Sequence, residues 1–397
     1  MTAYKGNECL LKAPGKILSL APFGVCEYWS LLVCLWKRRM EEDNKYMSKL
    51  SPTVDYWAGT YLVVIAVLSV LGNAAVLLTS ALRPTHLKAP ELLTVNLAVT
   101  DIGMALSMYP LSIASLFNHA WIGGDSSCLY YGLMGMIFST ASIMTLAVMG
   151  LVRYLVTGNP PKTGNKFQRR TITMVISVIW LYSGLWAVFP LLGWGGYGPE
   201  PFGVACSVDW ASYQDSLNRS TFIISLSILC TFIPCLVILF SYFGIAWKLH
   251  KAYQAIQSSD FNYGHIERKV TLMAVLISSG FIVAWSPYVV LSFWSMFHTK
   301  GKDSLAPVVS LLPCLFAKGS TAYNPFIYYI FRRSLRRELR QLQVLICCSA
   351  QPDSPSCRET GEEGRQSVRS DLLQSLPDNK NRAPLVGKLG TAALERV

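Results

Sequence analysis

The chain has 397 residues, of which 52% are hydrophobic and 15% are charged, and its formal net charge is +12. Soluble globular domains usually carry about 25% charged residues, so this composition excludes an ordinary soluble protein. A strongly basic chain can also bind nucleic acid, but that function requires a basic face on a soluble module, and the sequence shows none. We therefore expect an integral membrane protein that binds no nucleic acid.

Residues 1–55 precede the first long apolar stretch and form a segment of their own. Residues 17–36 are nearly apolar, and three bases follow them at once. A membrane span there would place these bases in the cytosol and invert every later span, and a signal peptide would need small residues at a cleavage site. We expect an extracellular segment that is a variable extension, or that results from a misplaced start with Met40 or Met47 as the true one.

Seven apolar stretches are long enough to cross a bilayer, whose hydrocarbon core of about 30 Å requires roughly 20 helical residues. They lie at about 57–82, 91–116, 129–155, 171–193, 219–247, 270–297 and 305–331. The sequence therefore predicts an all-α membrane protein, with a bundle of seven transmembrane helices over residues 56–331.

The basic residues predict how this bundle is oriented. The segment 153–170 carries five bases and no acid, and five arginines follow the last span, whereas 194–215 carries three acids and no base. Loops rich in lysine and arginine stay in the cytosol. We expect a multi-pass protein of the plasma membrane with its N-terminus extracellular and its C-terminus cytoplasmic.

The residues after the last span divide into two parts. Residues 332–348 are basic and amphipathic, which predicts a short cytoplasmic helix on the inner membrane lipid, and Cys347 and Cys348 at its end are candidates for palmitoylation. Residues 349–397 are rich in serine, proline and charge and poor in aromatic residues, which predicts a disordered cytoplasmic tail.

Two of the eleven cysteines lie where an oxidising compartment meets ordered structure. Cys128 is at the outer start of the third span, and Cys206 is in the outer loop after the fourth. We expect a disulfide between them that holds this loop over the bundle; the alternative is two unpaired thiols. The other cysteines fit packing positions, and no metal-binding spacing of cysteine and histidine occurs.

Polar and proline residues recur inside the spans, where each must find a partner within the protein because lipid offers none. In chain order they are Gly72-Asn73, Asn96-Leu97-Ala98, Asp101, Trp180, Pro234, Tyr242, Trp285-Ser286-Pro287-Tyr288 and Asn324-Pro325-Phe326-Ile327-Tyr328. This ordered set resembles the rhodopsin-like family of G-protein-coupled receptors over about residues 56–348. The resemblance implies a heterotrimeric G protein as partner, arrestin and a receptor kinase at the C-terminal tail, and no enzyme activity.

The same resemblance implies an activation switch inside the bundle, with Asp101, Asn73 and Asn324 in one buried polar network. The members of the switch are Asp101, Arg153, Tyr242, Glu267, Pro287, Asn324 and Tyr328. Pro287 removes a backbone hydrogen bond and is the expected hinge of the sixth span.

The chain departs from this family at the inner end of the third span. Val152 stands where the family has an acid before Arg153, and a buried guanidinium strongly prefers a carboxylate. Glu267, near the start of the sixth span, is then the expected partner of Arg153. We expect a less restrained resting state, and the departure leaves G-protein coupling open.

Lys318 is an ionisable residue in the middle of the last span. A charge at that depth costs roughly 2.5–3.5 kcal/mol, and pairing with a carboxylate or condensation with an aldehyde to a Schiff base relieves this cost. Ala317-Lys318, six positions before Asn324, resembles the opsins, in which this lysine carries retinal. The resemblance implies retinal, 11-cis or all-trans, as a Schiff base on Lys318; a structural lysine that is snorkelling or salt-bridged is the alternative.

A protonated Schiff base needs a counterion, because burial alone would drive off its proton. Visual opsins of vertebrates place a glutamate three residues after the cysteine of the third span, where this chain has Tyr131. Non-visual opsins use a glutamate six residues before the cysteine of the outer loop, so the resemblance implies Glu200. The alternatives are a solvated loop acid at Glu200 and a neutral Schiff base that absorbs in the ultraviolet. The outer loop also resembles the neuropsin group of opsins in Pro199-Glu200-Pro201-Phe202-Gly203, Cys206 and Asp209-Trp210.

The opsin resemblance further implies which residues line the retinal. They are Tyr131, Gly132, Gly135, Ser139, Trp210, Trp285 and Tyr288. Aromatic and small residues at helical spacing are also typical of an ordinary core, which is the alternative for each. Ser207, next to Cys206, has no thiol that could add to the polyene, so we expect no such adduct.

Three functions remain after this comparison of residues. The first is a non-visual light receptor that activates a G protein, and the second is a retinal photoisomerase with little signalling, which Val152 favours. The third is a receptor for a diffusible ligand in which Lys318 is incidental.

Overall fold

The computed structural model describes the backbone of residues 2–5, 8–13, 16–22, 45–81, 91–157, 168–255, 261–298 and 306–331. Within these ranges, side chains are described from residue 45 onward except at 249, 252–255 and 261–268. The chain divides into two units, Met1–Leu335 and Arg336–Val397, and the second lies wholly outside the described residues. The predicted helix at 332–348, the tail, Cys347 and Cys348 also lie outside them.

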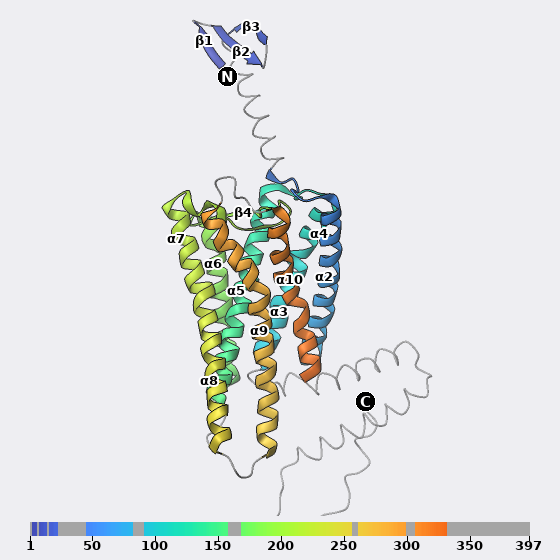
Figure 1. Ribbon diagram of the computed structural model, residues 1–397, viewed down its shortest axis with the longest axis vertical. Coiled ribbons are helices and arrows are strands. Elements are labelled where there is room, and N and C mark those ends of the chain that lie inside the picture. Colours follow the sequence, from blue (N-terminus) through green and yellow to red (C-terminus); the bar gives the residue numbers. More distant parts are fainter. Residues whose placement is uncertain are drawn as a thin grey trace, which may run out of the picture. The chain divides into compact units, whose positions relative to one another are not determined.

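Long helices run side by side and form most of the first unit (Figure 1). They are α2 (Pro52–Ala81), α3 (Glu91–Ser107), α4 (Tyr109–Phe117), α5 (Gly124–Val156), α6 (Arg169–Val188), α7 (Leu217–Leu226), α8 (Ile233–Ala255), α9 (Phe261–Phe297) and α10 (Pro307–Phe331). A π-helical stretch, η3 (Ser227–Phe232), joins α7 to α8, and short 3-10 helices occupy η1 (Phe189–Leu192) and η2 (Trp210–Gln214).

These helices account for seven membrane crossings, as predicted. In the described ranges, six helical stretches have both the length and the hydropathy to cross a bilayer. The seventh, α10, has the length, but Lys318, Asn324 and its prolines lower its mean hydropathy. The helices also extend past the apolar stretches: α5 begins at Gly124, whereas the third span was predicted from residue 129.

Proline interrupts one crossing and is accommodated in two others. The second crossing breaks at Met108 into α3 and α4, next to Pro110, which has no N–H to donate to the helix. By contrast, α9 continues through Pro287, and α10 continues through Pro313 and Pro325. The predicted hinge at Pro287 therefore lies inside one unbroken helix.

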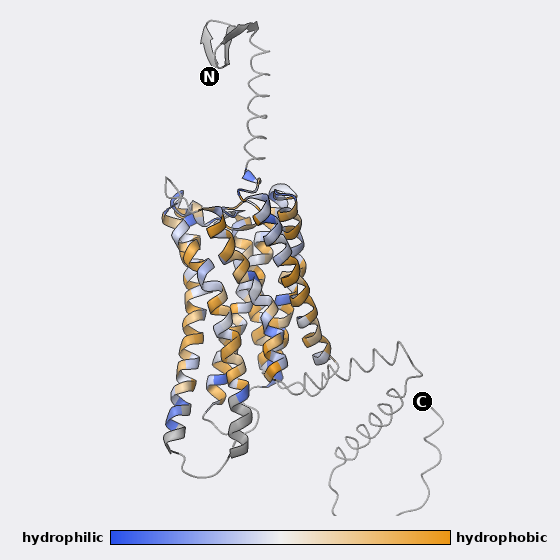
Figure 2. Ribbon diagram, turned by 45° about the vertical axis from the view of Figure 1, so that its right-hand side comes forward, coloured by the Kyte–Doolittle hydropathy of each residue, from blue (hydrophilic) through white to orange (hydrophobic). Residues whose placement is uncertain are grey.

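Hydrophobic residues make up much of the long helices of the bundle (Figure 2), and many large ones are exposed. Leu71, Leu181, Phe243 and Val290 are each more than 60% exposed, which is expected of side chains that contact lipid. The buried core gathers around tyrosine and phenylalanine side chains from α4, α5 and the outer loop, namely Tyr109, Tyr131 and Phe202.

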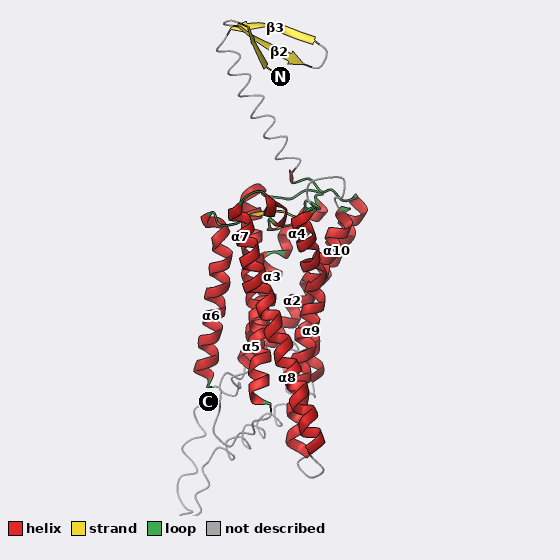
Figure 3. Cartoon of the chain, turned by 60° about the vertical axis from the view of Figure 1, so that its left-hand side comes forward, coloured by secondary structure: helices red, strands yellow, loops and turns green. Residues whose placement is uncertain are grey.

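A β-hairpin and an N-terminal stretch close one end of the bundle, which we call the outer end after the predicted orientation (Figure 3). β4 (Tyr197–Pro199) pairs antiparallel with β5 (Cys206–Val208), and the predicted disulfide joins Cys128 of α5 to Cys206. Residues 45–50 lie against the loop between β4 and β5, because the backbone N of Lys49 donates to Phe202 O at 3.1 Å. Gly203 has a φ of +92°, and a Cβ there would lie 2.3 Å from Met47 O, so this contact requires glycine.

The N-terminal residues contain strands that the sequence did not lead us to expect. β1 (Thr2–Lys5), β2 (Glu8–Ala13) and β3 (Lys16–Pro22) form an antiparallel sheet in that order. Only the backbone of these strands is described, and residues 23–44 lie outside the description.

Candidate functional site

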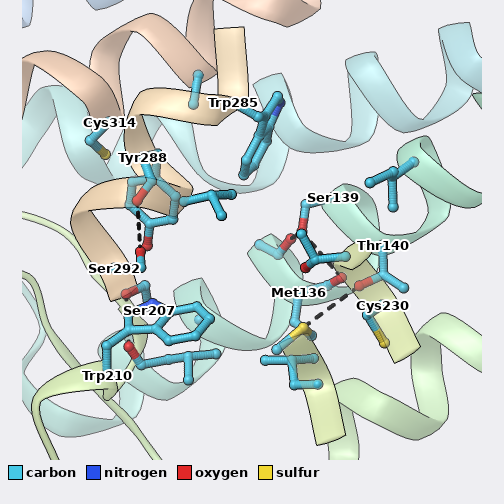
Figure 4. A pocket seen from close by; sticks show the side chains of 18 of the residues that line it. Met136, Ser139, Thr140, Ser207, Trp210, Cys230, Trp285, Tyr288, Ser292 and Cys314 are labelled. Atoms are coloured by element: carbon cyan, nitrogen blue, oxygen red, sulfur yellow. Dashed lines mark hydrogen bonds between the residues drawn. The ribbon is translucent and has the colours of Figure 1, made fainter. Parts of the chain in front are cut away.

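A cavity of about 340 Å³ lies inside the bundle near the outer end, a size typical of small-molecule sites (Figure 4). Its walls come from α5, η3, α9 and α10, and the loop of β4 and β5 covers it. Most lining residues are apolar. The few polar ones therefore define what the cavity can bind.

Lys318 reaches this cavity from the middle of α10. It is only 8% exposed, and its Nζ donates a hydrogen bond of 2.9 Å to Cys314 Sγ, one helical turn earlier. The Nζ also lies 5.7 Å from the centre of the Tyr131 ring on α5. No carboxylate pairs directly with Lys318 among the described ion pairs. The cavity thus contains a buried amine without an anionic neighbour in contact.

Glu200 lies at the edge of the same cavity, directly after β4, and is 8% exposed. Its backbone is fixed by two hydrogen bonds of 2.8 Å, from its own N to Ala205 O and from Gly203 N to its O. Tyr288 of α9 donates to Glu200 Oε1 at 2.7 Å. Glu200 is therefore a buried acid, which excludes the solvated loop acid that the sequence left as an alternative.

The charge of Glu200 is set by opposing influences. Burial raises the pKa of its carboxyl above the usual value, while hydrogen bonds from Ser207 and Tyr288 and the charge of Lys318 oppose that rise. The described ion pairs include none between Glu200 and Lys318, so the charge of Lys318 influences Glu200 without a direct ion pair among them.

Aromatic rings from α9 form one wall of the cavity. Trp285 stacks on Phe281 with ring centres 5.5 Å apart and meets Tyr288 edge-on at 6.1 Å. Trp285 Nε1 donates to Ser320 Oγ of α10 at 3.1 Å. This hydrogen bond ties α9 to α10 beside Lys318.

The small residues of α5 make room for neighbouring side chains. A Cβ on Gly132 would lie 2.5 Å from the Tyr197 ring, and one on Gly135 would lie 2.9 Å from Met108 Cε. Ser139 uses its hydroxyl within α5, donating to Gly135 O at 2.6 Å. Gly132, Gly135 and Ser139 all line the cavity, and the two glycines also make room for Tyr197 and Met108, of which Met108 lines the cavity too.

Two buried polar atoms at the cavity have no hydrogen-bond partner among the described residues. They are the hydroxyl of Tyr131, which is 1% exposed, and Nε1 of Trp210. Unsatisfied buried groups cost about 1–3 kcal/mol, so they indicate a cavity that is completed by a ligand or by water. Together with the buried amine and the apolar walls, they fit a long apolar molecule with one reactive end.

Comparisons with known proteins agree with this geometry. The family described as "7 transmembrane receptor (rhodopsin family)" matches residues 72–328. Opsin-5 of Mus musculus and of Homo sapiens are each 37% identical over 294 residues, 73% of this chain and 77% and 82% of theirs. The crystal structure of squid rhodopsin superposes with a TM-score of 0.68 at 27% identity, covering 79% of this chain and 92% of that one. The chain is an opsin of the rhodopsin family.

Membership of the opsins implies a retinal chromophore in a multi-pass membrane protein. All nine residues that the sequence predicted for the chromophore site line the one cavity. They are Tyr131, Gly132, Gly135, Ser139, Glu200, Trp210, Trp285, Tyr288 and Lys318. Their individual roles stay predictions.

The cavity of this opsin also contains residues that the sequence analysis missed. They include Met136, Thr140, Cys230, Ser292 and Cys314 (Figure 4). Cys314 lies four residues before Lys318, and this spacing indicated that its thiol could contact the Lys318 amine. The sequence analysis interpreted cysteines inside the spans only as packing residues. Cys230 lies in the π-helical turn, which no sequence pattern predicted.

The predicted polar network of the opsin is present in part. Asn324 Nδ2 donates to Asp101 Oδ2 at 2.8 Å. Asn73 Nδ2 instead donates to the backbone oxygens of Ser69 and Thr321, each at 2.9 Å. Asn73 therefore ties α2 to α10, and the described hydrogen bonds include none between Asn73 and Asp101.

The inner switch positions are placed as follows. Tyr242 and Ser278 share a hydrogen bond of 3.0 Å between α8 and α9, and Tyr328 is fully buried. Val152 is 4% exposed and Arg153 is half-buried. The side chain of Glu267 lies outside the described residues, so its expected pairing with Arg153 stays a prediction.

Proposed function

We propose that this opsin is a non-visual, neuropsin-like photoreceptor that binds 11-cis or all-trans retinal as a Schiff base on Lys318 and activates a heterotrimeric G protein. One observation carries the proposal: the Lys318 amine lines a mostly apolar cavity, and among the described residues it pairs with no carboxylate and donates to a thiol. A structural lysine would be expected to end in a carboxylate.

Retinal, when bound, supplies light absorption and a change of shape inside a close-packed cavity. The residues of the chain provide the rest. Lys318 provides the attachment point, and Glu200, held by Tyr288, provides negative charge that favours a protonated Lys318 nitrogen. The hairpin and its disulfide keep water away from the outer side.

The contacts around Trp285 support a route from the cavity to the inner end of the bundle. A ligand that changes shape pushes on Trp285, whose hydrogen bond to Ser320 joins α9 to α10. Packed interfaces respond to such a push by switching between discrete arrangements. We propose that α9 moves at its inner end, where the hydrogen bond between Tyr242 and Ser278 would break.

The proposal is tested by adding 11-cis and all-trans retinal to the purified full-length protein and recording absorption spectra, then light-dependent nucleotide exchange on a G protein. We expect a pigment from the wild type and none from Lys318→Arg, which keeps the charge but forms no imine. No pigment from the wild type, or equal pigment from Lys318→Arg, would reject retinal binding on Lys318.

A retinal photoisomerase with little signalling is the second candidate, and the buried Val152 favours it. The position that holds an acid in related receptors is apolar and 4% exposed here. The same experiment separates the candidates, because a photoisomerase would convert retinal in the light without accelerating nucleotide exchange.

The orientation and the tail complete the proposal. It includes an extracellular N-terminus over residues 1–55 and a cytoplasmic helix at 332–348 with palmitoylated Cys347 and Cys348. The tail at 349–397 would contact arrestin and a receptor kinase. These parts of the proposal rest on the sequence alone. Protease protection of the two termini in sealed vesicles would test the orientation.

A further inference from the structure

Cys314 is the group in contact with the Lys318 nitrogen. Its Sγ lies 2.9 Å from Nζ, it is 7% exposed, and it lines the cavity on the same helix. Side chains four residues apart lie on one face of a helix, and the later one leans back toward the earlier. The backbone of α10 therefore fixes this pair independently of any ligand.

Several other titratable groups face Lys318 from the elements packed around it. They are Tyr109 from α4, Tyr131 from α5, Glu200 from the outer loop and Tyr288 from α9. Tyr109 donates to the backbone oxygen of Lys318 at 2.8 Å, which leaves the amine itself free for Cys314. Glu200 accepts from Tyr288 and forms no ion pair with Lys318 among the described residues.

We propose that the Cys314 thiol is the direct hydrogen-bond partner of the Lys318 nitrogen in the pigment and helps that nitrogen to keep its proton. This inference rests on the proposed function. It divides the stabilisation of the positive charge between a sulfur in contact and a carboxylate further away. Sulfur accepts hydrogen bonds weakly, so the protonated state is held less firmly than by a carboxylate in the same place.

The test is a pH titration of the absorption spectrum of the full-length pigment. The protonated nitrogen gives a visible band and the neutral nitrogen gives an ultraviolet band. The ratio of the two bands therefore reports the midpoint, which is the pH at which half of the pigment is protonated at this nitrogen. Loss of the acceptor favours the neutral form, and we expect Cys314→Ala to lower the midpoint by about one pH unit. Cys314→Ser retains an acceptor and is expected to recover most of this shift.

Ser310→Ala is the matched control, because it removes a buried polar side chain from the same helix at a residue that does not line the cavity. Its midpoint is expected to equal that of the wild type. A general effect of truncating a buried side chain of α10 would shift both alanine variants alike and would overturn the inference.

A second measurement begins with the wild-type pigment itself. Its infrared difference spectrum, light minus dark, is expected to show a shifted S–H stretching band, and Cys314→Ser is expected to lose this band. Pigment with an unchanged midpoint in both Cys314 variants, or no S–H change, would overturn this inference alone. A wild type without pigment would overturn the proposed function, and this inference with it.

Discussion

At the residue scale, the environment of Glu200 decides how much negative charge reaches the cavity. The acid is buried, hydrogen-bonded to Tyr288, and not in contact with Lys318. Burial favours its neutral form, while the hydrogen bonds and the charge of Lys318 favour the ionised one. As the proposed counterion, Glu200 acts only while it is ionised, so we expect the pigment to be sensitive to acid.

We predict that Glu200→Gln lowers the pH at which the Lys318 nitrogen deprotonates by roughly one to three units, because a nearby anion stabilises the protonated form. In the wild type, the counterion charge is present above the raised pKa of Glu200 and is lost as the pH falls through it. An acid-induced spectral change is therefore expected in the wild type and absent from Glu200→Gln. Titration of the absorption spectrum checks both statements, and identical midpoints would exclude Glu200 as counterion.

Gly132 provides a second prediction at this scale. A Cβ there would lie 2.5 Å from the Tyr197 ring, whose hydroxyl donates to Ala187 O at 2.8 Å and is thereby fixed. We expect Gly132→Ala to destabilise the protein by about 1–3 kcal/mol, the usual cost of overpacking. Thermal denaturation in detergent measures the effect.

Gly184→Ala is the control for this substitution. Gly184 lies in α6, and a Cβ there would meet no atom within 4 Å. We expect no loss of stability, because alanine is the better helix former. Equal melting temperatures for the two variants would show that the close approach of Tyr197 does not matter.

At the scale of elements, α8 holds the inner end of α5. A Cβ on Gly244 would lie 2.4 Å from the Tyr154 ring, so glycine at this position leaves room for the ring of Tyr154. Lys248, one turn later, donates to Tyr154 O at 2.9 Å and to Thr157 O at 3.2 Å. A cation at the carboxyl end of a helix is favourable, and these contacts restrain α5 where Val152 provides no acid.

We predict that Lys248→Met raises G-protein activation in the dark roughly fivefold, which corresponds to about 1 kcal/mol lost from the resting state. Methionine keeps the length and apolar stem of the side chain but removes its donors. Val152→Glu is expected to act in the opposite direction by giving Arg153 a carboxylate. Nucleotide exchange in the dark is the measurement, and an unchanged rate in Lys248→Met would exclude the restraint.

How far the sequence predicted these elements depended on the kind of signal. Apolar length predicted the crossings because hydrocarbon thickness is constant, and Lys318 was conspicuous because charge is rare in lipid. The break at Met108 and the π-helical stretch depend on packing, which hydropathy does not report. The same limit applies to Gly132, whose neighbour Tyr197 is 65 residues away in the chain and comes close only in the fold.

At the scale of the whole described bundle, the outer end is closed by segments from three parts of the chain. Backbone hydrogen bonds join residues 45–50 to the β4–β5 hairpin. The disulfide between Cys128 and Cys206 joins the hairpin to the start of α5. Asp55, which is fully buried, adds a hydrogen bond of 2.9 Å between its Oδ2 and His119 Nδ1. This closure keeps Glu200 buried.

We predict that Cys206→Ser costs about 4 kcal/mol of stability, because the disulfide closes a loop of 78 residues. Glu200 lies six residues away on the same loop, so the loss should also reduce pigment yield. Denaturation and pigment yield measured together check this. A stable Cys206→Ser variant with full pigment would contradict it.

The most direct test of the account is the site at which retinal is attached. The protein is loaded with retinal, the linkage is reduced with borohydride, and the retinyl group is located by mass spectrometry of peptides. We predict a single modified residue, Lys318, and no retinyl group in Lys318→Arg. A retinyl group on another lysine, or none on Lys318, would contradict the account.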